Sequence, residues 1–247
     1  LPMIYVFEAR LSDGKFVSSR FTGYPVPEIG IGFLSYYLGS WAANSTTFIL
    51  NIFGLCLIYF SFFKKEKSKK LVIFLILCLS NQILFFDNLE PIDYSWAFFF
   101  LSLGCFLFSR NFIEIGILAL AFAVGCRLNF ILFAFIIIFF FQYDEKISIK
   151  RKLIFCFCVF VISGLFYLPI WYHNSFNLAW LTAARPLEQG FLGLISRFSY
   201  KTLMTIGIIQ FFLVFMIFFK KYQKLFLKEK LFLILLIISN LLIFLYI

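Results

Sequence analysis

The sequence predicts an all-α polytopic membrane protein with about eight transmembrane or half-length helices. Of its 247 residues, 63% are hydrophobic and only 14% are charged, whereas soluble domains have about 45–50% apolar and about 25% charged residues. One globular core of this size does not hide that much apolar surface, so lipid must solvate part of it. The apolar residues also come in long runs, which short basic connections separate.

Eight apolar runs follow one another along the chain. They cover 46–63, 71–86, 95–108, 112–126, 128–141, 153–172, 203–219 and 231–247. A membrane-spanning helix needs about 20 residues, with about 17 near the lower limit. Several runs are shorter than that, so the distribution of charge has to decide the topology.

Basic residues gather in the connections 64–70, 146–152 and 220–230 and at Arg110. The positive-inside rule places these connections in the cytoplasm. The outer side then receives 1–45, the acidic loop 87–94 and the long loop 173–202. All four Trp residues fall on that outer side, where a membrane interface favours Trp; they are Trp41, Trp96, Trp171 and Trp180. The net charge of +10 therefore reflects membrane orientation, and we expect no nucleic-acid partner.

The apolar stretch 112–141 is flanked by Arg110 and Lys146, which both lie on the cytoplasmic side. The chain must therefore cross an even number of times, and we predict two short helices that turn at 125–129. Such a turn places Arg127 in an outer cavity instead of the bilayer centre, where a charge costs on the order of 3 kcal/mol. One long tilted helix is the alternative, and it would reverse the topology of everything downstream.

The outer regions are expected to carry interfacial helices. We expect 1–45 to be an outer, periplasmic loop and 46–247 to form the multi-helix transmembrane domain. Two prolines and a glycine within 18–28 predict a non-helical stretch there. Beyond Glu28, whose charge suits a helix N-terminus, apolar residues at helical spacing predict a short interfacial helix. Loop 173–202 is predicted to carry an amphipathic helix for the same reason.

The acidic loop 87–94 allows two interpretations. It is either a solvated turn, or a site where clustered carboxylates hold a divalent cation such as Mg²⁺ or Mn²⁺ or supply a general base. Asp93 and Glu90 are the candidate metal ligands. His173, the only histidine, is expected to be an ordinary interfacial side chain. The six Cys residues all lie in apolar runs and are expected to be small apolar fillers.

The residues of the first outer loop resemble those of a known family. The stretches 9–15 and 19–25, followed by Glu28, resemble the first outer loop of GT-C type membrane glycosyltransferases, the protein mannosyltransferase group and its bacterial relatives, which use polyprenyl-phosphate sugars. An acidic residue in the next outer loop, here Asp93, continues the pattern. A Gly-x-x-x-Gly-x-Arg-like turn between two short helices is matched loosely by 121–128. The resemblance covers roughly residues 5–172.

The resemblance implies a multi-pass enzyme of the inner, cytoplasmic membrane. It would move a sugar from a polyprenyl-phosphate donor in the lipid bilayer to an acceptor glycan, lipid or protein on the outer face. The family's catalytic Asp would fall at or just before residue 1, and we expect the chain to be a fragment cut at both ends. Candidate catalytic residues are therefore Asp93, Asp13 and Glu8. Candidate substrate-binding residues are Arg20, Tyr24, Glu28, Arg127 and Arg185, with Arg20 and Arg127 on the phosphate.

Two other functions remain open at this point. A membrane transporter or flippase would be expected to show internal repeats and acidic residues at the bilayer midplane, and neither is evident in the sequence. A non-catalytic subunit, or another lipid-modifying membrane enzyme such as an O-antigen polymerase or an acyltransferase, is the third hypothesis. No Gly-rich phosphate-binding loop is present, which argues against a nucleotide bound from the cytoplasm.

Overall fold

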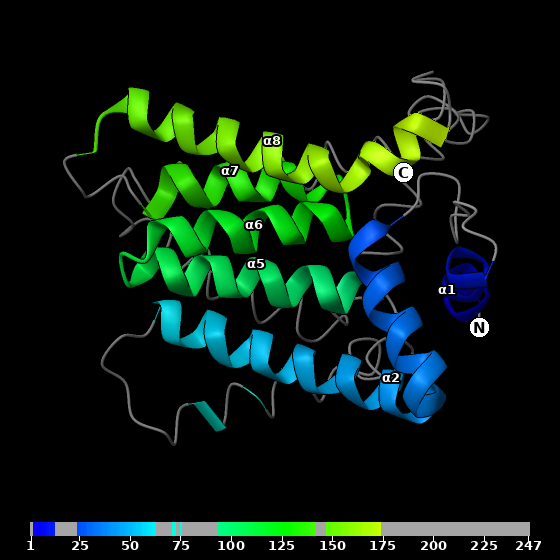
Figure 1. Cartoon of the computed structure of the whole chain (residues 1–247). Coiled ribbons are helices and arrows are strands. Elements are labelled where there is room, and N and C mark those ends of the chain that lie inside the picture. The colour runs from blue at the N-terminus through cyan, green and yellow to red at the C-terminus, as the bar shows by residue number, and fades with distance from the viewer. Residues whose placement is uncertain are drawn as a thin grey trace, which may run out of the picture.

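The computed structural model describes residues 2–12, 24–62, 71–72, 75, 93–141 and 147–173. In these residues the fold is all-α, as predicted, and has six helices (Figure 1). They are α1 (Pro2–Ser12), α2 (Pro25–Phe62), α5 (Asp93–Ser109), α6 (Ile113–Cys126), α7 (Phe130–Phe141) and α8 (Ile149–His173). The predicted runs 203–219 and 231–247, most of 71–86, and the predicted amphipathic helix in 173–202 lie outside the described residues.

Helices α5 to α8 lie side by side and alternate in direction (Figure 1). The later part of α2 runs beside α5, whereas the earlier part crosses the ends of the bundle. The described ends of these helices therefore lie at one of two ends of the bundle. The α5–α6 turn with Arg110 and the start of α8 with Lys150 share one end, and Asp93 and Arg127 lie at the other. The predicted topology requires this separation of basic connections from the acidic one.

Helix α2 consists of two segments, 25–38 and 40–62, which meet at a kink at Gly39. Gly39 has φ 83° and ψ 169°, a combination that is essentially restricted to glycine. The first segment corresponds to the predicted short helix after Glu28. The prediction that prolines keep 18–28 from being helical is wrong for 25–28, because Pro25 and Pro27 occupy the first turn, where backbone N–H groups need no helical partner.

The N-terminal region is also more helical than expected. Residues 2–12 form α1, although 1–45 was expected to be a loop apart from its interfacial helix. Phe7 of α1 packs on the first segment of α2, with ring centroids 6.2 Å from Phe33 and 5.9 Å from Tyr36. Tertiary aromatic contacts thus stabilise a helix whose own sequence shows weak amphipathic periodicity.

The prediction of two short helices within 112–141 is confirmed. Helix α6 ends at Cys126 and α7 begins at Phe130, so the turn consists of 127–129. Arg127 is extended, with φ −152° and ψ 122°, and its backbone N–H donates to the Ala123 carbonyl oxygen. A single long helix is excluded.

The core of the bundle lies where α6 meets its three neighbours. Leu120, Ala121 and Val124 of α6 are fully buried. They pack in one cluster with residues of α5, α7 and α8, among them Cys105, Phe108, Ala134, Ile138 and Val159. Cys105, Cys126 and Cys156 are free and buried, in agreement with their predicted role as apolar fillers.

Two of the described helices are long and apolar enough to cross a membrane. They are Pro25–Ser61 and Ile149–Tyr172. Only 28% of the residues in the most apolar window of α8 are buried. Large apolar side chains cover its outward surface, including Leu153, Phe157, Phe160, Leu165 and Leu168.

Candidate functional site

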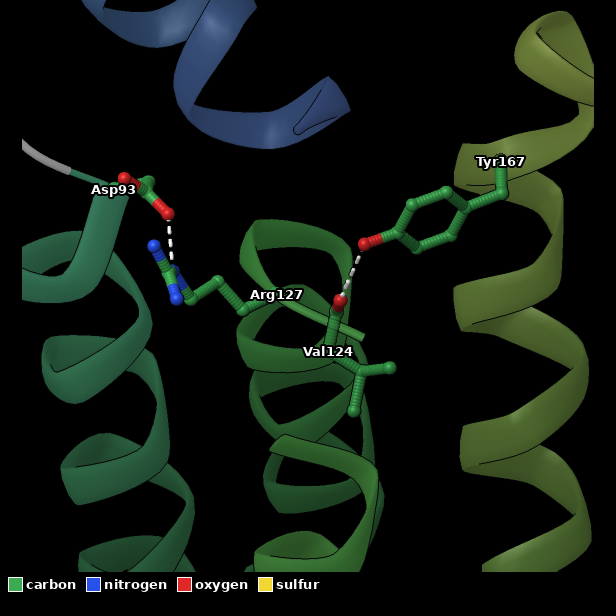
Figure 2. Close-up of polar contacts among 4 residues, drawn as sticks. All are labelled: Asp93, Val124, Arg127 and Tyr167. Carbon is green, nitrogen blue, oxygen red and sulfur yellow. Dashed lines mark hydrogen bonds and ion pairs between the residues drawn. The ribbon is translucent and has the colours of Figure 1, made fainter. Parts of the chain in front are cut away.

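A buried ion pair lies at the end of the bundle that the first segment of α2 crosses (Figure 2). The Nε of Arg127 donates to Oδ2 of Asp93. Asp93 is 0% exposed and Arg127 is 8% exposed. Two residues that the sequence marks separately, one from the acidic loop and one from the turn of the helical hairpin, therefore form one site.

Each charge lies at the helix end that favours it. Asp93 is the first residue of α5, where the positive end of the helix dipole stabilises a carboxylate. Arg127 directly follows α6, where the exposed carbonyl groups stabilise a cation. The phenolic O–H of Tyr167 on α8 donates to the Val124 carbonyl oxygen over 3.0 Å, which fastens the end of α6 to its neighbour (Figure 2).

Aromatic rings hold the guanidinium of Arg127. Its Cζ atom lies 3.2 Å from the ring centroid of Tyr94 and 5.3 Å from that of Tyr24. Both distances are within the range of cation–π attraction. The guanidinium is consequently fixed by one carboxylate and two rings, from three different parts of the chain.

Part of the hydrogen-bonding capacity of this pair is unused. Oδ1 of Asp93 is buried and has no hydrogen-bond partner. The only hydrogen bond that Arg127 makes through its side chain to the described residues is the one from Nε, so its terminal nitrogens retain donors. A buried carboxylate oxygen without a partner costs free energy, so such an exception calls for an explanation, such as a catalytic role or a bound water or ion. The site therefore offers a carboxylate oxygen of Asp93 that can accept a proton. Beside it, the guanidinium of Arg127 can donate two hydrogen bonds to one anion.

The first segment of α2 packs onto this end of the bundle through two close contacts. A Cβ added at Gly125 would lie 2.7 Å from Cγ2 of Val26, and one added at Gly30 would lie 2.5 Å from the ring of Trp96. The indole N–H of Trp96 donates to Oγ1 of Thr47 over 3.2 Å. Trp96 therefore contacts both segments of α2.

No protein family, curated protein or solved structure matches this chain.

The structure brings together three of the predicted site residues, Asp93, Arg127 and Tyr24. Glu28 is fully buried and pairs instead with Arg10 of α1, at 2.6 Å. Glu8 lies on α1, which packs on the first segment of α2. The remaining predictions, Asp13, Arg20, Glu90 and Arg185, fall outside the described residues.

The described residues do not by themselves fit a divalent cation. None of them form a group of three His, Cys, Asp or Glu side chains that could hold a metal ion. Asp93 is already paired with the guanidinium of Arg127, which repels a second cation. Glu90, the other predicted ligand, is outside the described part of the chain. The pair as described suits an anionic ligand better than a metal.

Sequence reasoning missed two contributors to this site. Tyr94 follows Asp93 directly and stacks on Arg127. Trp96, predicted only as an interfacial residue, packs against Gly30, in the notch left by the missing side chain of this glycine. The proximity of Tyr94 to Asp93 in the chain was the available indication. For Trp96, the two glycines that follow Glu28 indicate a place where a large side chain can approach the helix closely.

Proposed function

We propose that this chain is a GT-C type membrane glycosyltransferase, which transfers a sugar from a polyprenyl-phosphate donor to an acceptor glycan, lipid or protein. The reaction would take place at the outer face of the inner membrane. The observation that carries the proposal is the Asp93–Arg127 pair, in which a buried carboxylate oxygen without a partner lies beside a guanidinium with unused donors.

Helix lengths and exposed surfaces support a place in the bilayer. Helix α8 presents large apolar side chains outward, and a surface of that kind in water would be an aggregation site. The basic connections that the structure describes lie at the end opposite Asp93 and Arg127, in agreement with the positive-inside rule. We propose about eight transmembrane or half-length helices for the whole chain.

The chemistry needs no nucleotide-binding domain, since the donor already lies in the membrane. Oδ1 of Asp93 would accept the proton of a hydroxyl group on the acceptor molecule. At the same time, the oxygen of that hydroxyl group would attack the anomeric carbon of the sugar. The bond from that carbon to the phosphate oxygen would break, and the electron pair would leave with the lipid phosphate. The terminal N–H groups of Arg127 would stabilise the phosphate, because a guanidinium binds two phosphate oxygens at once.

The test is transfer from labelled polyprenyl-phosphate sugars by membranes that contain the chain. We expect Asp93→Asn to lower transfer by about 10²-fold or more, the usual contribution of a general base. Arg127→Lys should also lower transfer, because an ammonium ion does not replace a stacked bidentate guanidinium. Glu114→Gln and Arg110→Lys are the matched controls, since both side chains are exposed near the opposite end.

Three outcomes would contradict the proposal. The unmodified chain could turn over no polyprenyl-linked sugar from a panel of hexose and pentose donors. Flux of the donor lipid across proteoliposomes without transfer would indicate a transporter or flippase. Transfer that depends wholly on a co-purifying protein would indicate a non-catalytic subunit.

A further inference from the structure

The Asp93–Arg127 pair is closed in this structure. Asp93 is 0% exposed, yet a lipid-borne donor and an acceptor would both have to reach it. The first segment of α2 crosses the ends of α5 and α6 above the pair (Figure 2). The ring of Tyr24, the residue just before that segment, lies 5.3 Å from Cζ of Arg127.

We infer that the first segment of α2, residues 25–38, is a hinged lid over the Asp93–Arg127 pair, which turns at Gly39 to admit ligands. This inference rests on the proposed function for what enters the site, but the movement itself does not depend on it. Gly39 is the only residue of α2 with non-helical dihedral angles. Apart from its chain neighbours and its own helix backbone, no atom of the described residues lies within 4 Å of a Cβ built there, so none of them blocks movement at this position.

Close packing contacts at two glycines hold the lid against the bundle. The ring of Trp96 fills the notch at Gly30, while Val26 fills the notch at Gly125. Trp96 also bonds Thr47 of the second segment, so one side chain of α5 sets the angle between the two segments. A contact of this kind separates without leaving a buried ion unpaired, which keeps the cost of opening low.

The one charged side chain of the lid moves with it. Glu28 is fully buried and pairs with Arg10 of α1. Helix α1 packs on the lid through the rings of Phe7, Phe33, Tyr36 and Tyr37. The lid and α1 therefore form one unit, and opening at Gly39 does not require this ion pair to break.

Cys126 offers a native reporter of opening. It precedes Arg127 directly, is 0% exposed, and adjoins Gly125, on which Val26 of the lid packs. Cys105 is buried in the core between α5 and α6, away from the lid. Two variants would each keep one of these thiols and replace the other five cysteines, and the rate of labelling by a small membrane-permeant maleimide would be measured in the full chain.

We expect Gly39→Ala to accelerate labelling of Cys126 about tenfold, because the closed dihedral angles are strained for any residue except glycine. Gly30→Ala should have a similar effect by expelling Trp96 from its notch. Gly164→Ala in α8 is the matched control, since the nearest atom to its added Cβ is 3.9 Å away. Labelling of Cys105 should remain unchanged in all three.

Two results would contradict the inference that the first segment of α2 is a lid. Equal labelling of Cys126 in the variants and the control would show that the first segment does not move at Gly39. Faster labelling of Cys105 together with Cys126 would show that the bundle loosens as a whole. Neither readout needs a sugar, so a chain that transfers none but labels as expected would retain the lid and lose the proposed chemistry.

Discussion

Asp93 and Arg127 each depend on the other, because both are buried. Removing water from two charges costs several kcal/mol per ion, and their attraction compensates only while both are present. The pair gains further from the helix ends on which it lies and from the rings of Tyr94 and Tyr24. A change at one partner should therefore disturb stability as well as any reaction.

A double-mutant cycle measures this dependence. We expect Asp93→Asn or Arg127→Gln alone to lower the free energy of unfolding by about 3–5 kcal/mol, since each leaves one buried charge without a counter-ion. The double variant should lose less than the sum of the two. Thermal unfolding of detergent-solubilised protein gives the measurement, and strictly additive losses would contradict a coupled pair.

The two charges were predictable from the sequence, and their surroundings were not. Arg127 lies near the middle of the 30-residue apolar stretch 112–141, and a charge in that position needs an exposed turn or a partner. Asp93 belongs to an acidic loop between apolar runs. Their pairing, however, depends on which helix ends meet, and the stacking of Tyr94 depends on the direction that the guanidinium then takes. Glu28, predicted as a substrate-binding residue, is fully buried and pairs with Arg10, a contact that the sequence did not predict.

At the scale of elements, apolar runs predicted helices well. Runs 95–108, 112–126 and 153–172 correspond to α5, α6 and α8 with shifts of a few residues at their ends. Prediction failed at α1 and at the start of α2. Prolines mark both helix starts and loops, and α1 is stabilised by rings that lie more than 20 residues away in the sequence.

Close packing of α5 on α6 depends on glycine. A Cβ at Gly104 would lie 2.5 Å from Cδ2 and 2.8 Å from Cγ of Leu120, which is fully buried. We expect Gly104→Val to cost about 1–3 kcal/mol through overpacking, and thus to lower the unfolding temperature by several degrees. Gly164→Val is the control, since the nearest atom to a Cβ added there is 3.9 Å away. If both variants lost the same stability, the cause would be the changed helix propensity at these positions and not overpacking against Leu120.

At the scale of the whole molecule, the two ends of the bundle differ in character. The described basic connections lie at one end, whereas the other carries the Asp93–Arg127 pair, the lid and the three Trp residues of the described part of the chain. This asymmetry was predictable because charge follows a simple rule at membranes. The way in which α2 folds back over the bundle was not, since it depends on one dihedral angle at Gly39.

Labelling from outside the cell tests this orientation. Trp41 and Ile149 are 80% and 70% exposed and lie near opposite ends of the bundle. In a cysteine-free background, an impermeant maleimide should label Trp41→Cys on intact spheroplasts. It should label Ile149→Cys only after permeabilisation. Labelling of both positions from the same side would refute the proposed topology.

Helices α5, α6 and α7 are short, and this affects the thickness of the lipid layer around them. Helices α5, α6 and α7 have 17, 14 and 12 residues, so at 1.5 Å per residue they are about 26, 21 and 18 Å long. The hydrocarbon layer of a bilayer is about 30 Å thick, and a bilayer adapts to short helices by thinning locally. In the proposed setting the leaflet would form a shallow depression beside Arg127. A donor lipid that diffused into this depression would stay in its leaflet, and its phosphate would lie at the depth of the Arg127 guanidinium.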